Sequence, residues 1–187
     1  LFIAAATAIA IALILSGLLL ARLFVQHVED RVAAELQTHL NQIAAGLELN
    51  GEGVMQLANV PADPRFIEPY SGLYWQLDLS AARRQRSRSL WDFELVLPPD
   101  ELALGAIHRH ELSGPKRTRL FAVERSLTLD AGAQALPFRA IVAVDRHEID
   151  DAETKFRVAL WKSLAVIGTA LLITFGVMLQ VGWLPLR

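Results

Sequence analysis

The sequence predicts an α+β fold in which two transmembrane helices flank one extracytoplasmic domain with a long N-terminal helix and about five antiparallel strands. Two long runs, residues 1–21 and 163–186, contain no charged residue. Apart from Arg187, every Asp, Glu, Lys and Arg lies between these runs. Segments with the alternation typical of strands also lie there, between two stretches of helical period.

Each uncharged run is long enough to cross a bilayer, because about 20 helical residues span a hydrocarbon core of ~30 Å. The alternatives are a buried core helix or, for the first run, a cleaved signal peptide. No basic segment precedes that run and no small-x-small cleavage site follows it. We therefore predict transmembrane helices at residues 1–21 and 163–184, with a domain at 22–162 between them.

Orientation and completeness are further expectations. Arg187 directly follows the second run, which favours a cytoplasmic C-terminus. The sequence starts at Leu1 rather than at a methionine, so we expect a fragment that lacks a short leader.

The composition of the domain excludes several function classes. Arg187 is the one Lys or Arg residue outside residues 22–162, so the domain contains 17 of the 18 Lys and Arg residues and all 20 Asp and Glu residues. This near balance gives no reason to expect a nucleic-acid partner. The absence of Cys excludes disulfides, zinc-thiolate sites and cysteine nucleophiles.

Helical period is clear at both ends of the domain. Apolar residues recur every three or four positions over residues 23–49, which predicts an amphipathic helix continuous with the first span and ended by Asn50 and Gly51. From Arg146 the helical period returns and runs directly into the second span.

Strands are predicted between these helices. Strict alternation puts Trp75 on the apolar side of a half-buried strand over 72–79, and Trp91 on the apolar side of its hairpin partner. The nearly continuous apolar segment before Asp145 predicts the central strand. The predicted strands are 54–60, 72–79, 88–95, 118–129 and 138–145.

Several blocks resemble the sensor region of proteobacterial two-component sensor histidine kinases, in the family's order and over essentially the whole chain. They are residues 63–66, 69–77, 86–92, 114–115 with Arg125, 142–150 with 156–157, and 184–187. The resemblance implies a PAS-like periplasmic sensor domain, a homodimer in the bacterial inner membrane, and a HAMP linker that starts at 185–187.

The same resemblance implies a parent protein that is an ATP-dependent histidine kinase, uses ATP and Mg and phosphorylates a cytoplasmic response regulator. Its catalytic domains would follow Arg187, so we expect no enzymatic activity, no catalytic residue and no cofactor in this fragment. A chemoreceptor or cyclase sensor of the same layout, and a membrane-anchored scaffold protein, are the alternatives. No motif indicates the stimulus.

Candidate ligand-binding residues follow from strand faces and charge. Tyr74 and Gln76 point away from the Trp75 side, where PAS-like domains often hold a ligand. Arg86 and Arg88 belong to an arginine-rich turn that could bind an anion or lipid headgroups. The alternatives are a solvated hairpin and, for these two arginines, structural pairing with Asp92 or Glu94.

His108 and His110 are the candidates for a metal pair. On a strand, residues two apart share a face, so the two imidazoles could bind one ion. Neighbouring basic residues would repel a cation, and we expect a solvated loop here and no metal site.

Overall fold

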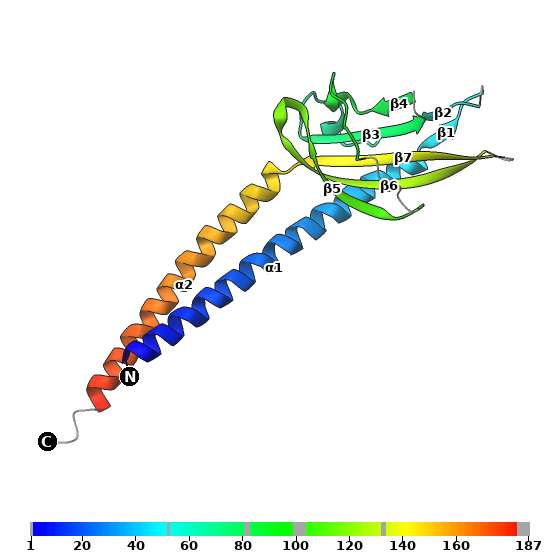
Figure 1. The fold of residues 1–187 in the computed structure, drawn as a ribbon. Coiled ribbons are helices and arrows are strands. Elements are labelled where there is room, and N and C mark those ends of the chain that lie inside the picture. The colour runs from blue at the N-terminus through cyan, green and yellow to red at the C-terminus, as the bar shows by residue number, and fades with distance from the viewer. Residues whose placement is uncertain (1, 52, 81–82, 99–103, 132–133, 183–187) are drawn as a thin grey trace. The chain divides into compact units, whose positions relative to one another are not determined.

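The computed structural model describes residues 2–51, 53–80, 83–98, 104–131 and 134–182. It is α+β, with a long N-terminal helix, antiparallel strands and a C-terminal helix (Figure 1). In chain order the elements are α1 (Phe2–Ala45), β1 (Leu47–Leu49), β2 (Met55–Leu57), η1 (Pro64–Phe66), β3 (Leu73–Ser80), β4 (Arg83–Arg86), η2 (Arg88–Leu90), β5 (Ile107–Ser113), η3 (Pro115–Arg117), β6 (Arg119–Ala131), β7 (Gln134–Asp145) and α2 (His147–Gly182).

The chain forms two compact units. We call Leu1–Glu29 with Ile149–Arg187 the helical unit and Asp30–Glu148 the sheet unit. Helices α1 and α2 each continue from one unit into the other without a break. The predicted start of a HAMP linker at 185–187 lies outside the described residues.

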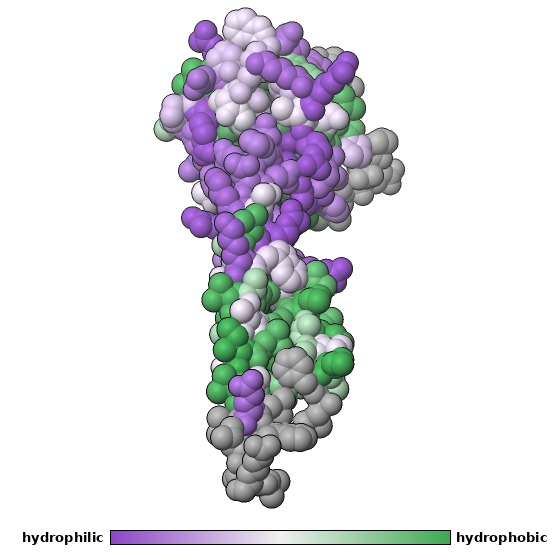
Figure 2. Space-filling view, turned by 90° about the vertical axis from the view of Figure 1, so that its left-hand side faces the viewer, coloured by the Kyte–Doolittle hydropathy of each residue, from purple (hydrophilic) through white to green (hydrophobic). Residues whose placement is uncertain are grey.

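The helical unit carries the two helices that are long and apolar enough to span a membrane. On the face that Figure 2 shows, most of the coloured side chains of the membrane-span candidates are hydrophobic. Its helices touch closely: the rings of Phe24 and Phe156 stack 3.9 Å apart. A Cβ atom at Gly17 would lie only 2.7 Å from Leu164, so this glycine allows the close approach.

Helix α1 ends earlier than the apolar spacing predicts. It stops at Ala45, and Leu47–Leu49 is strand β1, paired with β2. Gly46, a poor helix former, marks the change, and its carbonyl accepts a hydrogen bond from Ala58 (2.9 Å). The predicted stop at Asn50 is instead the turn of a hairpin, where the Asn50 side chain accepts a hydrogen bond from the Val54 amide.

The main sheet has five antiparallel strands in the order β4-β3-β7-β6-β5. The prediction that the last strand is central is confirmed, since β7 pairs with both β3 and β6. Residues 140–144 of β7 are all buried, as expected for a strand with neighbours on both sides.

Both faces of the sheet are covered. On one face Tyr74, Ala122 and Ile141 pack with Leu90 and Leu95 from the segment that follows β4. On the other face lie residues 30–45 of α1, whose apolar stripe is buried, and η1 (Figure 1). Strand β3 is therefore buried on both faces, and the prediction of a half-buried strand is wrong.

The hairpin partner of β3 also differs from the prediction. Strand β4 pairs with β3, whereas the predicted strand 88–95 forms η2 and an irregular segment. Trp91 has a positive φ (54°), a backbone conformation that a β-strand does not contain, and it breaks the alternation. Its side chain is 56% exposed, so the predicted core position is wrong for Trp91 and correct for Trp75.

Truncating the α1 stripe will test this packing. Leu40 is completely buried, and we expect Leu40→Ala to lower the free energy of unfolding by about 2–5 kcal/mol. Val96→Ala, at an 81% exposed position, should change it by less than about 0.5 kcal/mol. Urea unfolding of the chain in detergent, followed by circular dichroism, measures both; equal effects would contradict the assigned packing.

Candidate functional site

A groove of about 540 Å³ lies at the β4 end of the sheet unit, beside the β1–β2 hairpin and η1. This volume is within the range of small-molecule sites. Its apolar lining consists of Leu57, Val60, Phe66, Ile67 and Trp75. Val60 and Ile67 are more than half exposed, so the groove presents hydrophobic surface to solvent.

The polar lining of the groove is basic. It consists of Gln56, Gln85, Arg86, Ser87 and Arg88, and no described lining residue is acidic. Two of these side chains hold the walls together. Gln85 accepts a hydrogen bond from the Leu57 amide (3.0 Å), and Ser87 accepts one from the Trp75 amide (3.1 Å).

The two arginines of this lining differ in their partners. Arg86 donates to the Phe93 carbonyl and to Glu94, both at 3.2 Å, and Arg84 binds the same carboxylate. The predicted structural pairing of Arg86 with Glu94 is thus confirmed. Arg88 is exposed and has no acidic partner among the described residues. Within the described lining, Arg88 is therefore the arginine whose charge is not balanced by a described carboxylate.

Tyr74 and Gln76 lie on the opposite face of the sheet, both at most 2% exposed. The Gln76 side chain donates to the Leu95 carbonyl (3.1 Å) and accepts from the Leu95 amide (2.9 Å), which fixes the covering segment. Burial raises the pKa of Tyr74. Arg86 pairs directly with Gln76 across the β3–β4 ladder, so its side chain points to this same face, where it binds the covering segment; Arg86 and Arg88 both border the groove.

His108 and His110 lie on strand β5, so the expected solvated loop is wrong. Their rings are 6.3 Å apart. His110 Nε2 lies 3.1 Å from Glu124 Oε2, and Arg139 binds the other oxygen of this fully buried carboxylate. Among the described residues, no three His, Cys, Asp or Glu side chains are grouped to hold a metal ion.

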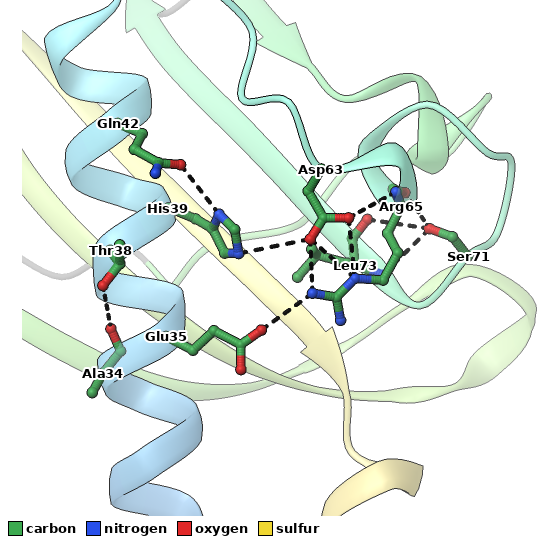
Figure 3. Close-up of polar contacts among 9 residues, drawn as sticks. All are labelled: Ala34, Glu35, Thr38, His39, Gln42, Asp63, Arg65, Ser71 and Leu73. Atoms are coloured by element: carbon green, nitrogen blue, oxygen red, sulfur yellow. Dashed lines mark hydrogen bonds and ion pairs between the residues drawn. The ribbon is translucent and has the colours of Figure 1, made fainter.

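A cluster of charged residues that the sequence analysis did not single out joins η1 to α1 (Figure 3). Arg65 binds Asp63 (2.8 Å) from within the same turn and reaches Glu35 of α1 (3.1 Å). His39 of α1 lies 3.9 Å from Asp63. We call Glu35, His39, Asp63 and Arg65 the η1 clamp.

The η1 clamp depends on local structure that a sequence signal could have indicated. Asp63 precedes a proline and caps η1, accepting a hydrogen bond from the Arg65 amide (2.9 Å). The hydrogen bond from the Arg65 side chain holds the pKa of Asp63 below its ordinary value of 3.8. The clamp residues on α1, Glu35 and His39, are distant in sequence from Asp63 and Arg65, so no local sequence pattern indicates that they are partners.

Comparisons with known proteins give one informative relative. No family model and no solved structure matches the chain. The chain is 34% identical over 113 residues to the sensor protein kinase CarS of Pseudomonas aeruginosa. The alignment covers 58% of this chain and 24% of CarS, so the chain spans about a quarter of that relative. This similarity supports a relationship to sensor kinases in general.

The lowered pKa of Asp63 predicts a pH-dependent contribution to stability. The charged pair stabilises the fold above the ordinary carboxyl pKa of 3.8, and this contribution is lost as pH falls through the lower folded-state value. The difference in unfolding free energy between wild type and Asp63→Asn should therefore be constant above about pH 5 and narrow below 3.8. Urea titrations across this range measure it; a constant difference would contradict the assignment.

Gln76 offers a second test, at the opposite face. Gln76→Ala removes both partners of the Leu95 backbone and leaves buried polar groups unpaired, which should cost about 1–3 kcal/mol. Gln56→Ala, at an exposed position, is the matched control and should be nearly neutral. Denaturant unfolding compares the two. A neutral Gln76→Ala would show that this side chain does not anchor the segment.

Proposed function

We propose that this chain is the stimulus-sensing and signal-transmitting module of a two-component sensor histidine kinase. The observation that carries the proposal is the similarity to a sensor protein kinase, found in a chain with two helices long enough to span a membrane. In this proposal the sheet unit is a PAS-like domain in the periplasm, and the helical unit lies in the bacterial inner membrane as part of a homodimer.

The connection between the sheet and the two long helices supports signal transmission. One residue, Arg146, separates the central strand β7 from α2. On the other side, the η1 clamp holds α1 to a turn that also contributes Phe66 to the groove. A shift of η1 would therefore move α1 relative to the strand that leads into α2.

The free energy available for such a signal is the difference between the binding free energies of the stimulus for the two conformations. A stimulus moves the equilibrium between two conformations only as far as its affinities for them differ, typically by about 1–3 kcal/mol. The parent protein would pass the change to a HAMP linker and a catalytic region that uses ATP and Mg. That region would phosphorylate a response regulator.

The test uses the full-length parent protein in membrane vesicles. We expect ATP- and Mg-dependent formation of acid-labile phosphohistidine. A parent protein without this activity would overturn the proposal; a methyl-accepting or cyclase output would indicate the same sensor layout with another function.

The η1 clamp gives the residue-level prediction. Arg65→Gln removes the ion pair with Glu35 of α1. We expect basal autophosphorylation to change by about 5-fold or more, because about 5-fold corresponds to the lowest coupling free energies that are typical of allosteric proteins. Arg83→Gln removes an exposed positive charge that is outside the clamp and should leave the activity unchanged. Equal activities of wild type and Arg65→Gln would show that the clamp does not transmit the signal.

A further inference from the structure

A second groove, of about 760 Å³, lies between α1 and α2 inside the helical unit. Packing holds its two walls together, because the rings of Phe24 and Phe156 stack 3.9 Å apart. A Cβ atom at Gly17 of α1 would lie 3.0 Å from the ring of Trp161 on α2. The groove is therefore a defined recess between two helices in direct contact, and we call it the interhelical groove.

The interhelical groove changes from apolar to charged along α1. Its apolar part is lined by Leu15, Leu18 and Leu19, which belong to the first uncharged run. Its polar part begins at Arg22, the first charged residue after that run. The hydrocarbon core of a bilayer accepts the apolar part and strongly disfavours the charged part. In a membrane the interhelical groove therefore crosses from acyl-chain depth to headgroup depth.

Trp161 lines the groove from the α2 side and is 37% exposed. Tryptophan is enriched where a bilayer meets water, because its ring is apolar and its N–H is polar. Phospholipid is the molecule that surrounds a spanning helix at this depth. The chemistry of the lining therefore decides which phospholipid occupies the groove.

The charged lining favours an anion. The charged residues of the described lining are Arg22, Arg157 and Glu153, so positive charge is in excess. Arg157 binds Glu153 one helical turn away (3.3 Å), an exposed pair of the kind that contributes little. Arg22 has no ion pair within the described part of the chain. Both guanidinium groups are exposed, so a headgroup can reach them.

We propose that the interhelical groove binds an anionic phospholipid. Its phosphate pairs with Arg22 and Arg157, and its acyl chains lie along Leu15, Leu18 and Leu19. A guanidinium matches the geometry of a phosphate, and bonds between charged groups are among the stronger polar contacts in proteins. A zwitterionic lipid carries the same phosphate, but the excess positive charge repels its ammonium group. The inference rests on the membrane placement in the proposed function and not on kinase activity.

The position of the two arginines gives the lipid a regulatory role. Arg22 belongs to α1 and Arg157 to α2, so one headgroup links both helices at the edge of the membrane. A lipid that binds one arrangement of these helices more tightly shifts the equilibrium toward it. The anionic lipid content of the membrane is therefore a second input to the same helices.

The test is native mass spectrometry of the delipidated 187-residue chain with equal concentrations of phosphatidylglycerol and phosphatidylcholine of identical acyl chains. We expect phosphatidylglycerol to bind at least about 5-fold more tightly, the contribution of one basic residue near an anionic lipid surface. Equal binding, or a preference for phosphatidylcholine, would overturn the proposal. So would a dimer that excludes phosphatidylglycerol, because a second copy of the chain would then cover the groove.

Two variants separate a site from general attraction to basic residues. Arg22→Gln should lower the preference for phosphatidylglycerol about 5-fold. Lys162→Gln removes an equal charge beside Trp161 but outside the described lining, and it should leave the preference unchanged. Equal effects of the two variants would overturn the proposal. The comparison of the two lipids needs only the wild-type chain, so it stands even where a variant fails to fold.

Fluorescence quenching in nanodiscs locates the bound lipid. Trp161→Phe identifies the contribution of Trp161 among the four tryptophans. We expect phosphatidylglycerol with brominated acyl chains to quench Trp161 more strongly than brominated phosphatidylcholine at the same mole fraction. Equal quenching by the two lipids would place the anionic lipid elsewhere and contradict the assigned site.

The result is separate from the test of kinase function. Selective lipid binding without phosphohistidine formation in the parent would retain the lipid site and reject the kinase. Phosphohistidine formation without selective binding would do the reverse.

Discussion

The sheet unit depends on a strand pair that is buried on both faces. Strands β3 and β7 carry apolar side chains in both directions, so the sheet needs two covers. Residues 30–45 of α1 lie on one face and the segment after β4 on the other. Hydrophobic burial supplies the stability of this arrangement, but it does not fix where each cover sits. Directional polar contacts do that, through Arg65 on one face and Gln76 on the other.

The different roles of hydrophobic burial and of polar contacts explain which features the sequence could predict. The spacing of apolar residues and the polarity of each segment are local properties of the sequence. They correctly indicated the helical segments, the central position of β7 and the burial of Trp75. They failed where a single residue changes the backbone direction. An apparently helical repeat changes to a strand at Gly46, and an apparent alternation ends at Trp91, whose φ is positive. Neither effect changes the hydrophobic pattern, so pattern analysis could not detect them.

The candidate site was harder to predict for a different reason. Alternation assigned Tyr74 and Gln76 to a shared face, and they do share one, but the groove lies on the other side. The groove combines a hairpin, a 3-10 turn and a sheet edge that are separated along the chain. The η1 clamp is likewise made from residues about 30 positions apart, Glu35 and Arg65. Such tertiary juxtapositions leave no periodic signal in one sequence.

The junction between β7 and α2 has a consequence for the start of the helix. Asp145 ends the strand and caps the helix by accepting the His147 amide, and Arg146 between them is held by the Arg119 carbonyl and by Glu111. One extra residue between Asp145 and His147 would move the capping carboxylate away from the amide that it accepts. The point at which α2 begins is therefore set by the end of a β-strand.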